Sequence, residues 1–370
     1  MNSHNASLSP AGQSPLGRRR WGATRVGERA SLLLCLLAVS SCGALTPPRP
    51  DGGTGGGGTQ TGGGTQTGGG SGGGTEAPWL EVTLQVPPGT MGTVQRLSAR
   101  PGEIYALIAN QYLLRSAGGA FTEVLVYSTP VISDFQLSGT GLVALTPVAS
   151  LMACTAGCEF GASYDEYALG ATPIAVCGSA DWLGVMTRTP DAGAALFEQN
   201  ANGTQWDFVN KLNLRTPLDC ARTTRGELFV AGQGGVGNVT ATGTSIEVPS
   251  TAALGRVSTN EAWTKVATDG TWVIASSARG AVARRPEDGG WQVAGALTGE
   301  ISALAVESAT EVWVVGTGLG LARFDGTAWS PAGLGPSQLT RFDALAVESS
   351  QVYVGGRDAA GVARVFRRLR

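Results

Sequence analysis

Short apolar runs separated by Gly and Asp turns recur along the C-terminal part of the chain at a period near forty residues. Residues 303–308 and 344–349 share the identical sequence ALAVES, 41 positions apart. Each copy is followed by a second apolar run with an aromatic centre, at 312–316 and 352–356. A period near forty built of β-rich runs and tight turns is typical of a β-propeller blade. The pattern therefore predicts an all-β β-propeller with blades of four antiparallel strands.

The second apolar run of each blade can be followed upstream, where it becomes less regular. It is centred on seven anchor residues: Tyr105, Val143, Leu183, Phe229, Trp272, Trp313 and Tyr353. Seven anchors predict seven blades, although spacing alone leaves six or eight open. In the later blades a Gly-containing turn precedes a Trp, as at Trp206, Trp291 and Trp329. We expect this Trp to pack between neighbouring blades, with stacking on sugars as the alternative.

The last blade has one strand too few. After runs at 341–349, 351–356 and 361–368 the sequence given stops. An unused segment at 79–86 alternates apolar and polar residues, as a half-buried strand does. We predict that residues 80–86 supply the outer strand of the last blade and close the ring, which removes an open sheet edge.

The repeat, V-[WY]-V-x-G followed by a Gly-rich turn and x-[DN]-G-x-x-W, resembles repeats in bacterial secreted and lipid-anchored propeller proteins. It is more loosely similar to the Asp-box repeats of sialidase-like propellers. The resemblance covers residues 94–370 in spacing and 262–370 in motif. No copy carries both the Ser/Thr and the Asp expected ahead of the Asp-box Gly, which argues against membership of the sialidase enzymes.

The N-terminal segment has the order of a bacterial lipoprotein signal. Five Arg precede the apolar run 32–39, and Ser40, Ser41 and Cys42 follow it. A basic flank, a short apolar stretch and small residues before a cleavage point define a secretory signal. We expect residues 1–41 to be a signal peptide and Cys42 to carry the lipid, with plain secretion or an uncleaved anchor as the alternatives. Residues 43–78 are almost free of apolar side chains, so we expect a disordered Gly/Thr/Pro-rich tether ahead of the propeller domain 79–370.

Composition excludes several classes of function. The only histidine is His4, so a chain cleaved before Cys42 has no imidazole for Ser-His-Asp or Cys-His catalysis or for a histidine-bound metal. That cleaved chain carries 21 basic and 27 acidic residues. Nucleic-acid binding needs concentrated positive charge, so we expect no nucleic-acid partner. No motif predicts a cofactor.

Four cysteines remain beyond the signal and the lipid site: Cys154, Cys158, Cys177 and Cys220. An even number in an exported domain indicates disulfides. Of the three possible pairings we favour Cys154–Cys158 with Cys177–Cys220, the second of which would join the innermost strands of blades three and four. Four cysteine ligands for zinc are the alternative, but Cys-x-x-x-Cys with two distant single cysteines is a poor zinc pattern.

One acidic segment is a candidate ligand site. Asp165 and Glu166 lie between Tyr164 and Tyr167, in what the sequence presents as a polar insertion of blade two. Paired carboxylates beside aromatic rings suit glycoside hydrolysis or calcium binding, and a solvated hairpin tip is the alternative. A sialidase-like site would also need several Arg at the ring axis, for which Arg188, Arg222 and Arg284 are candidates.

One motif is a decoy. Residues 232–237 satisfy G-x-G-x-x-G, but a second strand follows them rather than the helix that a dinucleotide site needs, so we interpret them as a hairpin turn.

Together these observations predict a monomeric, lipid-anchored propeller that acts as a non-enzymatic binding or scaffold module in the bacterial cell envelope. Gly43 after the lipid Cys favours the outer membrane. The expected partners are the membrane, through Cys42, and a protein or glycan ligand. The alternatives are a sialidase-like carbohydrate-active enzyme and an outer-membrane assembly factor.

Overall fold

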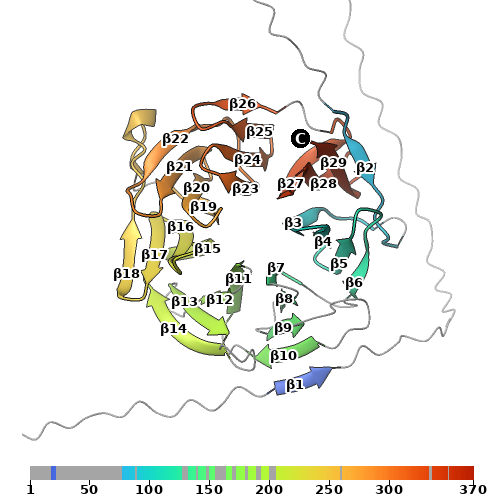
Figure 1. Cartoon of the computed structure of the whole chain (residues 1–370), viewed down its shortest axis with the longest axis horizontal. Helices are drawn as coiled ribbons and strands as arrows, with labels where there is room; N and C mark the ends of the chain where they lie inside the picture. The colour runs from blue at the N-terminus through green and yellow to red at the C-terminus, as the bar shows by residue number, and fades with distance from the viewer. Residues whose placement is uncertain are drawn as a thin grey trace, which may run out of the picture. The chain divides into compact units, whose positions relative to one another are not determined.

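The chain folds into a ring of seven four-stranded antiparallel sheets, as Figure 1 shows. The structure is a computed structural model that describes residues 18–21, 77–87, 90–126, 132–138, 141–146, 150–154, 164–168, 172–179, 182–188, 193–199, 206–258, 261–332, 336–348 and 350–370. Cys42, Cys158 and residues 43–76 lie outside this part, so the signal peptide, lipid site and tether stay predictions. Within the described part, no helix is long and apolar enough to cross a bilayer.

Each blade runs outwards from the ring axis, and its strands follow one another in sequence. Blade 1 contains β3 (Val94–Arg100), β4 (Glu103–Ile108), β5 (Tyr112–Ser116) and β6 (Thr122–Val126). Blade 2 contains β7 (Asp134–Ser138), β8 (Gly141–Thr146), β9 (Ser150–Cys154) and β10 (Tyr164–Ala168). Blade 3 contains β11 (Thr172–Ser179), β12 (Trp182–Arg188), β13 (Ala194–Gln199) and β14 (Trp206–Leu212). Blade 4 contains β15 (Arg215–Arg222), β16 (Leu228–Gln233), β17 (Gly235–Thr240) and β18 (Gly243–Glu247).

The remaining blades continue in the same way. A single turn of 3-10 helix, η1 (Ala252–Leu254), lies between blades 4 and 5. Blade 5 contains β19 (Trp263–Thr268), β20 (Trp272–Ser277), β21 (Ala281–Pro286) and β22 (Gln292–Ala296). Blade 6 contains β23 (Ala303–Ser308), β24 (Glu311–Gly316), β25 (Gly320–Phe324) and β26 (Trp329–Pro331). Blade 7 contains β27 (Leu339–Glu348), β28 (Gln351–Asp358), β29 (Ala363–Leu369) and, from the other end of the propeller domain, β2 (Leu80–Val82).

All seven anchors predicted from the sequence lie on the second strand of a blade, so the prediction of seven blades is confirmed. Along these strands consecutive residues are buried, as in β24 and β28. The reason is that each blade is covered on both faces by its neighbours. The buried apolar residues form seven clusters, and each cluster lies between two adjacent blades. The core of this protein is therefore the set of junctions around the ring.

The glycine that ends the V-[WY]-V-x-G motif is required by close backbone packing. A Cβ at Gly316 would lie 1.8 Å from the carbonyl oxygen of Glu300, and one at Gly356 would lie 1.8 Å from that of Arg341. In both cases the carbonyl belongs to the segment that enters or forms the innermost strand. The repeated glycine in the sequence thus marks where the second strand approaches the chain that leads to the ring axis.

Ring closure by the N-terminal segment is confirmed, with a shorter strand than the sequence indicates. β2 pairs with β29 through Leu80, Glu81 and Val82 rather than over the whole of 80–86. Beyond Val82 the chain turns to blade 1, where the amide of Phe121 donates to the carbonyl of Thr83 (2.8 Å) and the amide of Gln85 donates to the carbonyl of Phe121 (2.9 Å). The segment therefore joins blade 7 to blade 1.

Two of the predicted inter-blade tryptophans have that role. The Trp291 ring meets Phe229 of blade 4 edge-on at 6.2 Å, and its Nε1 donates to Glu247 Oε2 on the same neighbouring blade at 2.7 Å. Trp329 of blade 6 donates from Nε1 to the Ala294 carbonyl of blade 5 at 3.0 Å. The side chain of Trp206 lies outside the described part.

We expect Trp291→Phe to destabilise the protein by about 1.5 kcal/mol, because the ring packing survives but a hydrogen bond to a charged acceptor is lost. Trp329→Phe, which loses a bond to a neutral carbonyl, should cost about 1 kcal/mol. Urea denaturation followed by far-UV circular dichroism measures both. Equal, near-zero losses would contradict the assignment of these tryptophans as inter-blade links.

Candidate functional site

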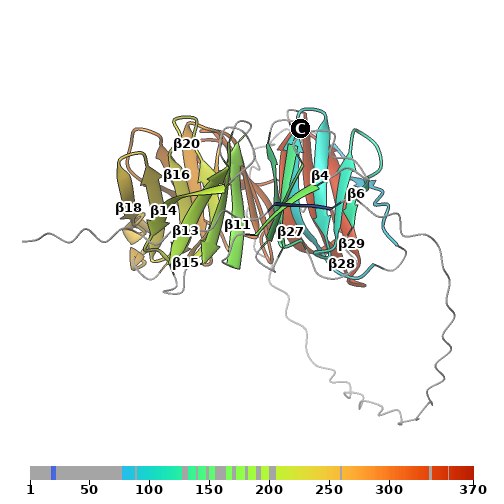
Figure 2. The ribbon, with the colours of Figure 1, turned by 90° about the horizontal axis from the view of Figure 1, so that it is seen from below.

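A polar cavity of about 370 Å³ lies where the seven innermost strands converge on the ring axis. Residues from every innermost strand line it, from β3 through β27. Figure 2, turned by 90° from Figure 1, shows β11 and β27 running through the middle of the ring. Its volume is within the range of small-molecule sites. Its charged lining residues are Arg96, Asp134, Asp219, Lys265 and Asp343.

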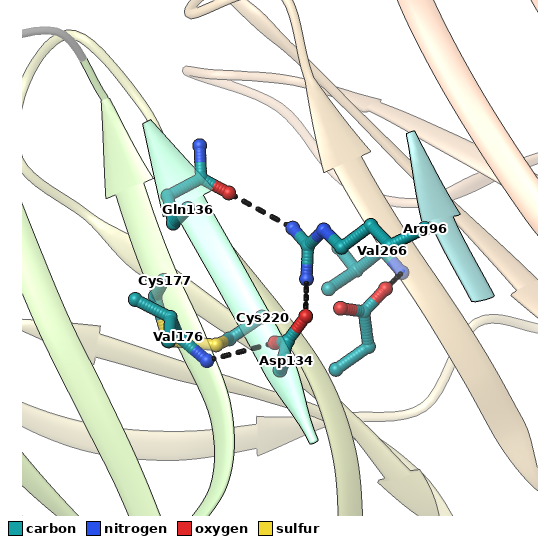
Figure 3. The surroundings of a disulfide bond; sticks show 8 residues. Arg96, Asp134, Gln136, Val176, Cys177, Cys220 and Val266 are labelled. Atoms are coloured by element: carbon teal, nitrogen blue, oxygen red, sulfur yellow. Dashed lines mark hydrogen bonds and ion pairs between the residues drawn. A yellow bond between two sulfur atoms is a disulfide. The ribbon is translucent and has the colours of Figure 1, made fainter. Parts of the chain in front are cut away.

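Arg96 crosses from blade 1 to blade 2 inside this cavity. Its Nη1 forms an ion pair with Asp134 Oδ1 at 2.5 Å, and its Nη2 donates to Gln136 Oε1 at 2.8 Å, as Figure 3 shows. Burial disfavours the guanidinium charge, but Asp134 and Asp219 outweigh this effect and raise the pKa of Arg96. Arg96 therefore stays charged and is neutralised by blade 2.

Asp134 joins blade 2 to blade 3 as well. Its Oδ2 accepts the amide of Val176 at 3.0 Å (Figure 3), and its Oδ1 accepts the amide of Phe135 at 2.9 Å. The carboxylate is 9% exposed, so these bonds and Arg96 replace the water that it lacks. Asp134 is thus a structural link whose hydrogen-bonding capacity is largely used.

Asp219 makes the equivalent link one step around the ring. It lies on β15 of blade 4, and its Oδ2 accepts the amide of Val266 of blade 5 at 3.0 Å. Burial raises the pKa of Asp219 and Asp134 adds to the rise, whereas Lys265, Arg96 and the Val266 amide oppose it. Asp219 therefore holds a proton more tightly in the folded protein than in the unfolded chain.

The predicted disulfide between Cys177 and Cys220 is present in the structure, with Cα atoms 5.3 Å apart. It joins β11 to β15, the innermost strands of blades 3 and 4, and lies beside Asp134 in Figure 3. The other proposed pair lies outside the described residues at Cys158; Cys154 ends β9.

Asp343 completes the links on the other side of the ring. Its carboxylate accepts from Thr93 Oγ1, which precedes β3 of blade 1, and from Arg341 Nε at 2.5 Å. Side-chain links next to the axis therefore join blades 7 to 1, 1 to 2, 2 to 3, 3 to 4 and 4 to 5. Among the described residues, Glu307 of β23 pairs with Arg370, directly after β29, and so joins blades 6 and 7, whereas no such link from an innermost strand joins blades 5 and 6.

Two polar lining groups from blades 5 and 6, together with one from blade 1, have no partner in the described part of the chain. Lys265 of β19 makes no hydrogen bond or ion pair there, and neither does the hydroxyl of Ser302, just before β23. On the opposite side, Oε1 of Gln95 is buried without a hydrogen-bond partner. Lys265 and Ser302 are partly exposed to the cavity, whereas a buried atom such as Gln95 Oε1 normally has a partner in the protein, in water or in a ligand.

The acidic segment at 164–167 does not contribute to this cavity. It forms β10, the fourth strand of blade 2, rather than the hairpin tip that was the alternative to a ligand site. The backbone of β1 (Arg18–Trp21) pairs with this strand as a fifth member, with Arg19 opposite Glu166 and Arg20 opposite Asp165.

The three arginines considered for a sialidase-like site are also elsewhere. Arg188 is an exposed residue at the end of β12, and Arg222 donates from Nε to the Gly226 carbonyl at 3.2 Å. Arg284 of β21 stacks over Trp272 and Phe324, with Cζ 5.5 and 5.3 Å from the two ring centroids. Arg96 is the only arginine among the described residues that line the cavity.

Sequence reasoning missed the charged residues of the cavity. A signal for four of them is present: Arg96, Asp134, Asp219 and Asp343 each lie nine or ten residues before a blade anchor, within an apolar strand. The G-x-G-x-x-G match, by contrast, is the turn between β16 and β17, so its interpretation as a hairpin is confirmed.

Because the pKa of Asp219 is raised, we expect Asp219→Asn to stabilise the protein at neutral pH. An acid that binds its proton more tightly when folded stabilises the fold below its unfolded pKa. That stabilisation falls as pH rises through the folded pKa. Asn cannot ionise, yet it can still accept the Val266 amide. Thermal denaturation from pH 3 to pH 8 should show a higher Tm for the variant at pH 7 and no gain at pH 3. A gain that is constant with pH would contradict this.

No protein-family model and no curated protein sequence matches the chain. Solved structures of the same fold do. A structure of YCF48 bound to D1 peptide is 16% identical with a TM-score of 0.58, covering 79% of this chain and 97% of that one. A streptogramin B lyase is 14% identical with a TM-score of 0.62, covering 80% and 98%.

An extracellular domain from a B. thetaiotaomicron protein described as a hybrid two-component system is 13% identical, with a TM-score of 0.57. It covers 78% of this chain and 39% of that one. At these identities the likeness concerns the fold alone. What the comparisons establish together with the strand topology is that this chain has the seven-bladed β-propeller fold.

Proposed function

We propose that this chain is a lipid-anchored, extracytoplasmic binding module that takes a small polar ligand in the cavity on its ring axis. The observation that carries the proposal is the uneven use of polar groups in that cavity. The carboxylates of Asp134 and Asp343 form hydrogen bonds to neighbouring blades. Lys265, Ser302 and Gln95 Oε1 have no partner among the described residues. Polar groups around a cavity that no protein group uses are available to hydrogen-bond or pair with a ligand.

The location outside the cytoplasm is supported by three features. The basic region, apolar run and Cys42 follow one another in the order of a lipoprotein signal. The disulfide Cys177–Cys220 suits an oxidising compartment. A neighbour of the same fold is an extracellular domain.

A peptide ligand is the second candidate. The neighbour YCF48 is described as bound to D1 peptide, and a peptide segment could reach the same cavity from one face of the ring. This reading corresponds to the assembly-factor alternative. The sialidase-like alternative is less well supported, since the three candidate arginines do not line the cavity. The streptogramin B lyase neighbour does not favour a histidine-dependent reaction for this chain. The only histidine is His4, which lies in the predicted signal peptide.

Two measurements test the proposal. Cys42→Ala should abolish incorporation of a labelled fatty acid and move the protein from the membrane to the soluble fraction after export, with Cys35→Ala as the matched control. Separately, a library of small polar metabolites should raise the Tm of the exported Cys42→Ala chain in a way that Lys265→Met abolishes and Lys211→Met does not. Membrane retention without Cys42 would exclude the lipid anchor, and no Lys265-dependent ligand would exclude the binding site.

A further inference from the structure

Two of the three lining groups without a partner among the described residues, Lys265 and Ser302, lie on one arc of the ring, next to Asp219, which uses one carboxylate oxygen for the Val266 amide. Asp219, Lys265 and Ser302 come from the adjacent blades 4, 5 and 6. The opposite arc, blades 7, 1, 2 and 3, has its charges neutralised internally by Arg96 with Asp134 and by Arg341 with Asp343. A ligand would therefore gain polar contacts mainly on the arc formed by blades 4 to 6.

This arc presents one negative and one positive group that do not satisfy each other. Lys265 is close enough to oppose the rise in the pKa of Asp219, yet no ion pair within 4.0 Å joins the two among the described residues. Asp219 uses its Oδ2 for the Val266 amide, and no bond to its Oδ1 occurs in the described part. Each group is thus placed to meet a ligand group of opposite charge.

Apolar surface accompanies these charges. Leu218, directly before Asp219, lines the cavity and is 40% exposed, and Leu304 lines it two residues after Ser302. An exposed leucine in an axial cavity provides a contact for an aliphatic group. The arc therefore combines a carboxylate, an ammonium, a hydroxyl and an aliphatic wall.

From this combination we propose that the cavity binds a compact zwitterion with an aliphatic side chain, of which a free α-amino acid such as leucine is the simplest form. The ligand ammonium meets Asp219, its carboxylate meets Lys265 and Ser302, and its side chain lies against Leu218. This inference rests on the proposed function, because it names the ligand class of the same site.

The two charges of the ligand can be tested one at a time. Isothermal titration of the exported Cys42→Ala chain with L-leucine, N-acetyl-L-leucine and L-leucinamide compares the zwitterion with analogues that lack one charge. We expect binding of L-leucine and at least tenfold weaker binding of each analogue. In Lys265→Met, L-leucine and L-leucinamide should bind with equal affinity, because the partner of the ligand carboxylate is gone. In Asp219→Asn, L-leucine and N-acetyl-L-leucine should bind with equal affinity, because the partner of the ligand ammonium is gone.

The chain offers a direct spectroscopic readout, because Lys211 and Lys265 are its only lysines. Reductive methylation with ¹³C-formaldehyde labels both side chains. Titration with L-leucine should shift the Lys265 resonance and leave that of Lys211, an exposed residue of β14, unchanged. Lys211→Met assigns the signals and serves as the matched control.

The outcomes separate this inference from the function on which it rests. If L-leucine and other zwitterions leave Lys265 unchanged while another class of ligand from the metabolite library shifts it, the ligand class is wrong and the binding site stands. If a short peptide binds but no free amino acid does, the peptide-binding alternative is correct. If no ligand of any class shifts Lys265, both proposals fail.

Discussion

Replacing Cys177 and Cys220 together by Ala is expected to lower the free energy of unfolding by about 4 kcal/mol. The bond closes a loop between residues 43 apart, and in the chain-entropy account a loop of this length restricts the unfolded state by about that amount. The two cysteines are 0% and 7% exposed, so Ala adds only a small packing loss. Guanidinium denaturation of the oxidised protein and of the double variant measures the difference.

The comparison that makes this result informative is the second predicted pair. Cys154 and Cys158 are four residues apart, so the same account gives a bond between them about 2 kcal/mol. Cys154→Ala/Cys158→Ala should therefore destabilise the protein less than Cys177→Ala/Cys220→Ala. The reverse order would show that the bond between blades 3 and 4 adds little to the links around it.

The size of the effect also reflects where the bond lies. Its neighbours in sequence, Val176 and Asp219, take part in the links from blade 2 to 3 and from blade 4 to 5. The disulfide therefore lies between two further links in a continuous series. Lys265 and Ser302 lie on blades 5 and 6, between which no such link from an innermost strand occurs among the described residues. The same axial strands thus provide both rigidity on one arc and free polar groups on the other.

The architecture could be predicted from the sequence because each blade repeats the same pattern of residues. Trp313 and Tyr353 lie at equivalent places in consecutive blades, and Gly316 and Gly356 recur because the backbone leaves no room for a Cβ. A residue that every blade requires recurs in the sequence at the spacing of the blades. The closing strand was also visible, because Leu80 to Val86 alternates in a way that needs a sheet partner.

The cavity could not be predicted in the same way, because its residues differ from blade to blade. Arg96, Asp134 and Lys265 come from blades 1, 2 and 5, and only ring closure brings them to one axis. A single charged residue in an apolar strand looks like an isolated exception until its neighbours across the ring are known. The acidic stretch at Asp165 and Glu166 was the opposite case: it is conspicuous in sequence, but it lies on an outer strand.

Disrupting ring closure is expected to have an effect as large as loss of the disulfide. Val82 of β2 is 7% exposed and belongs to the cluster between blades 7 and 1, whereas Leu80 on the same strand is 54% exposed. Val82→Asp should destabilise the protein by about 4 kcal/mol, because it removes apolar burial and places a carboxylate among Val94, Val365 and their neighbours. Leu80→Asp, the matched control, should change stability by less than about 1 kcal/mol.

The test is guanidinium denaturation of both variants together with limited proteolysis between residues 77 and 92. Val82→Asp should make this segment sensitive to cleavage at denaturant concentrations where the rest of the ring is intact, because the strand that joins the two ends of the propeller detaches first. Equal stability of the two variants would mean that the other blades hold the ring without it.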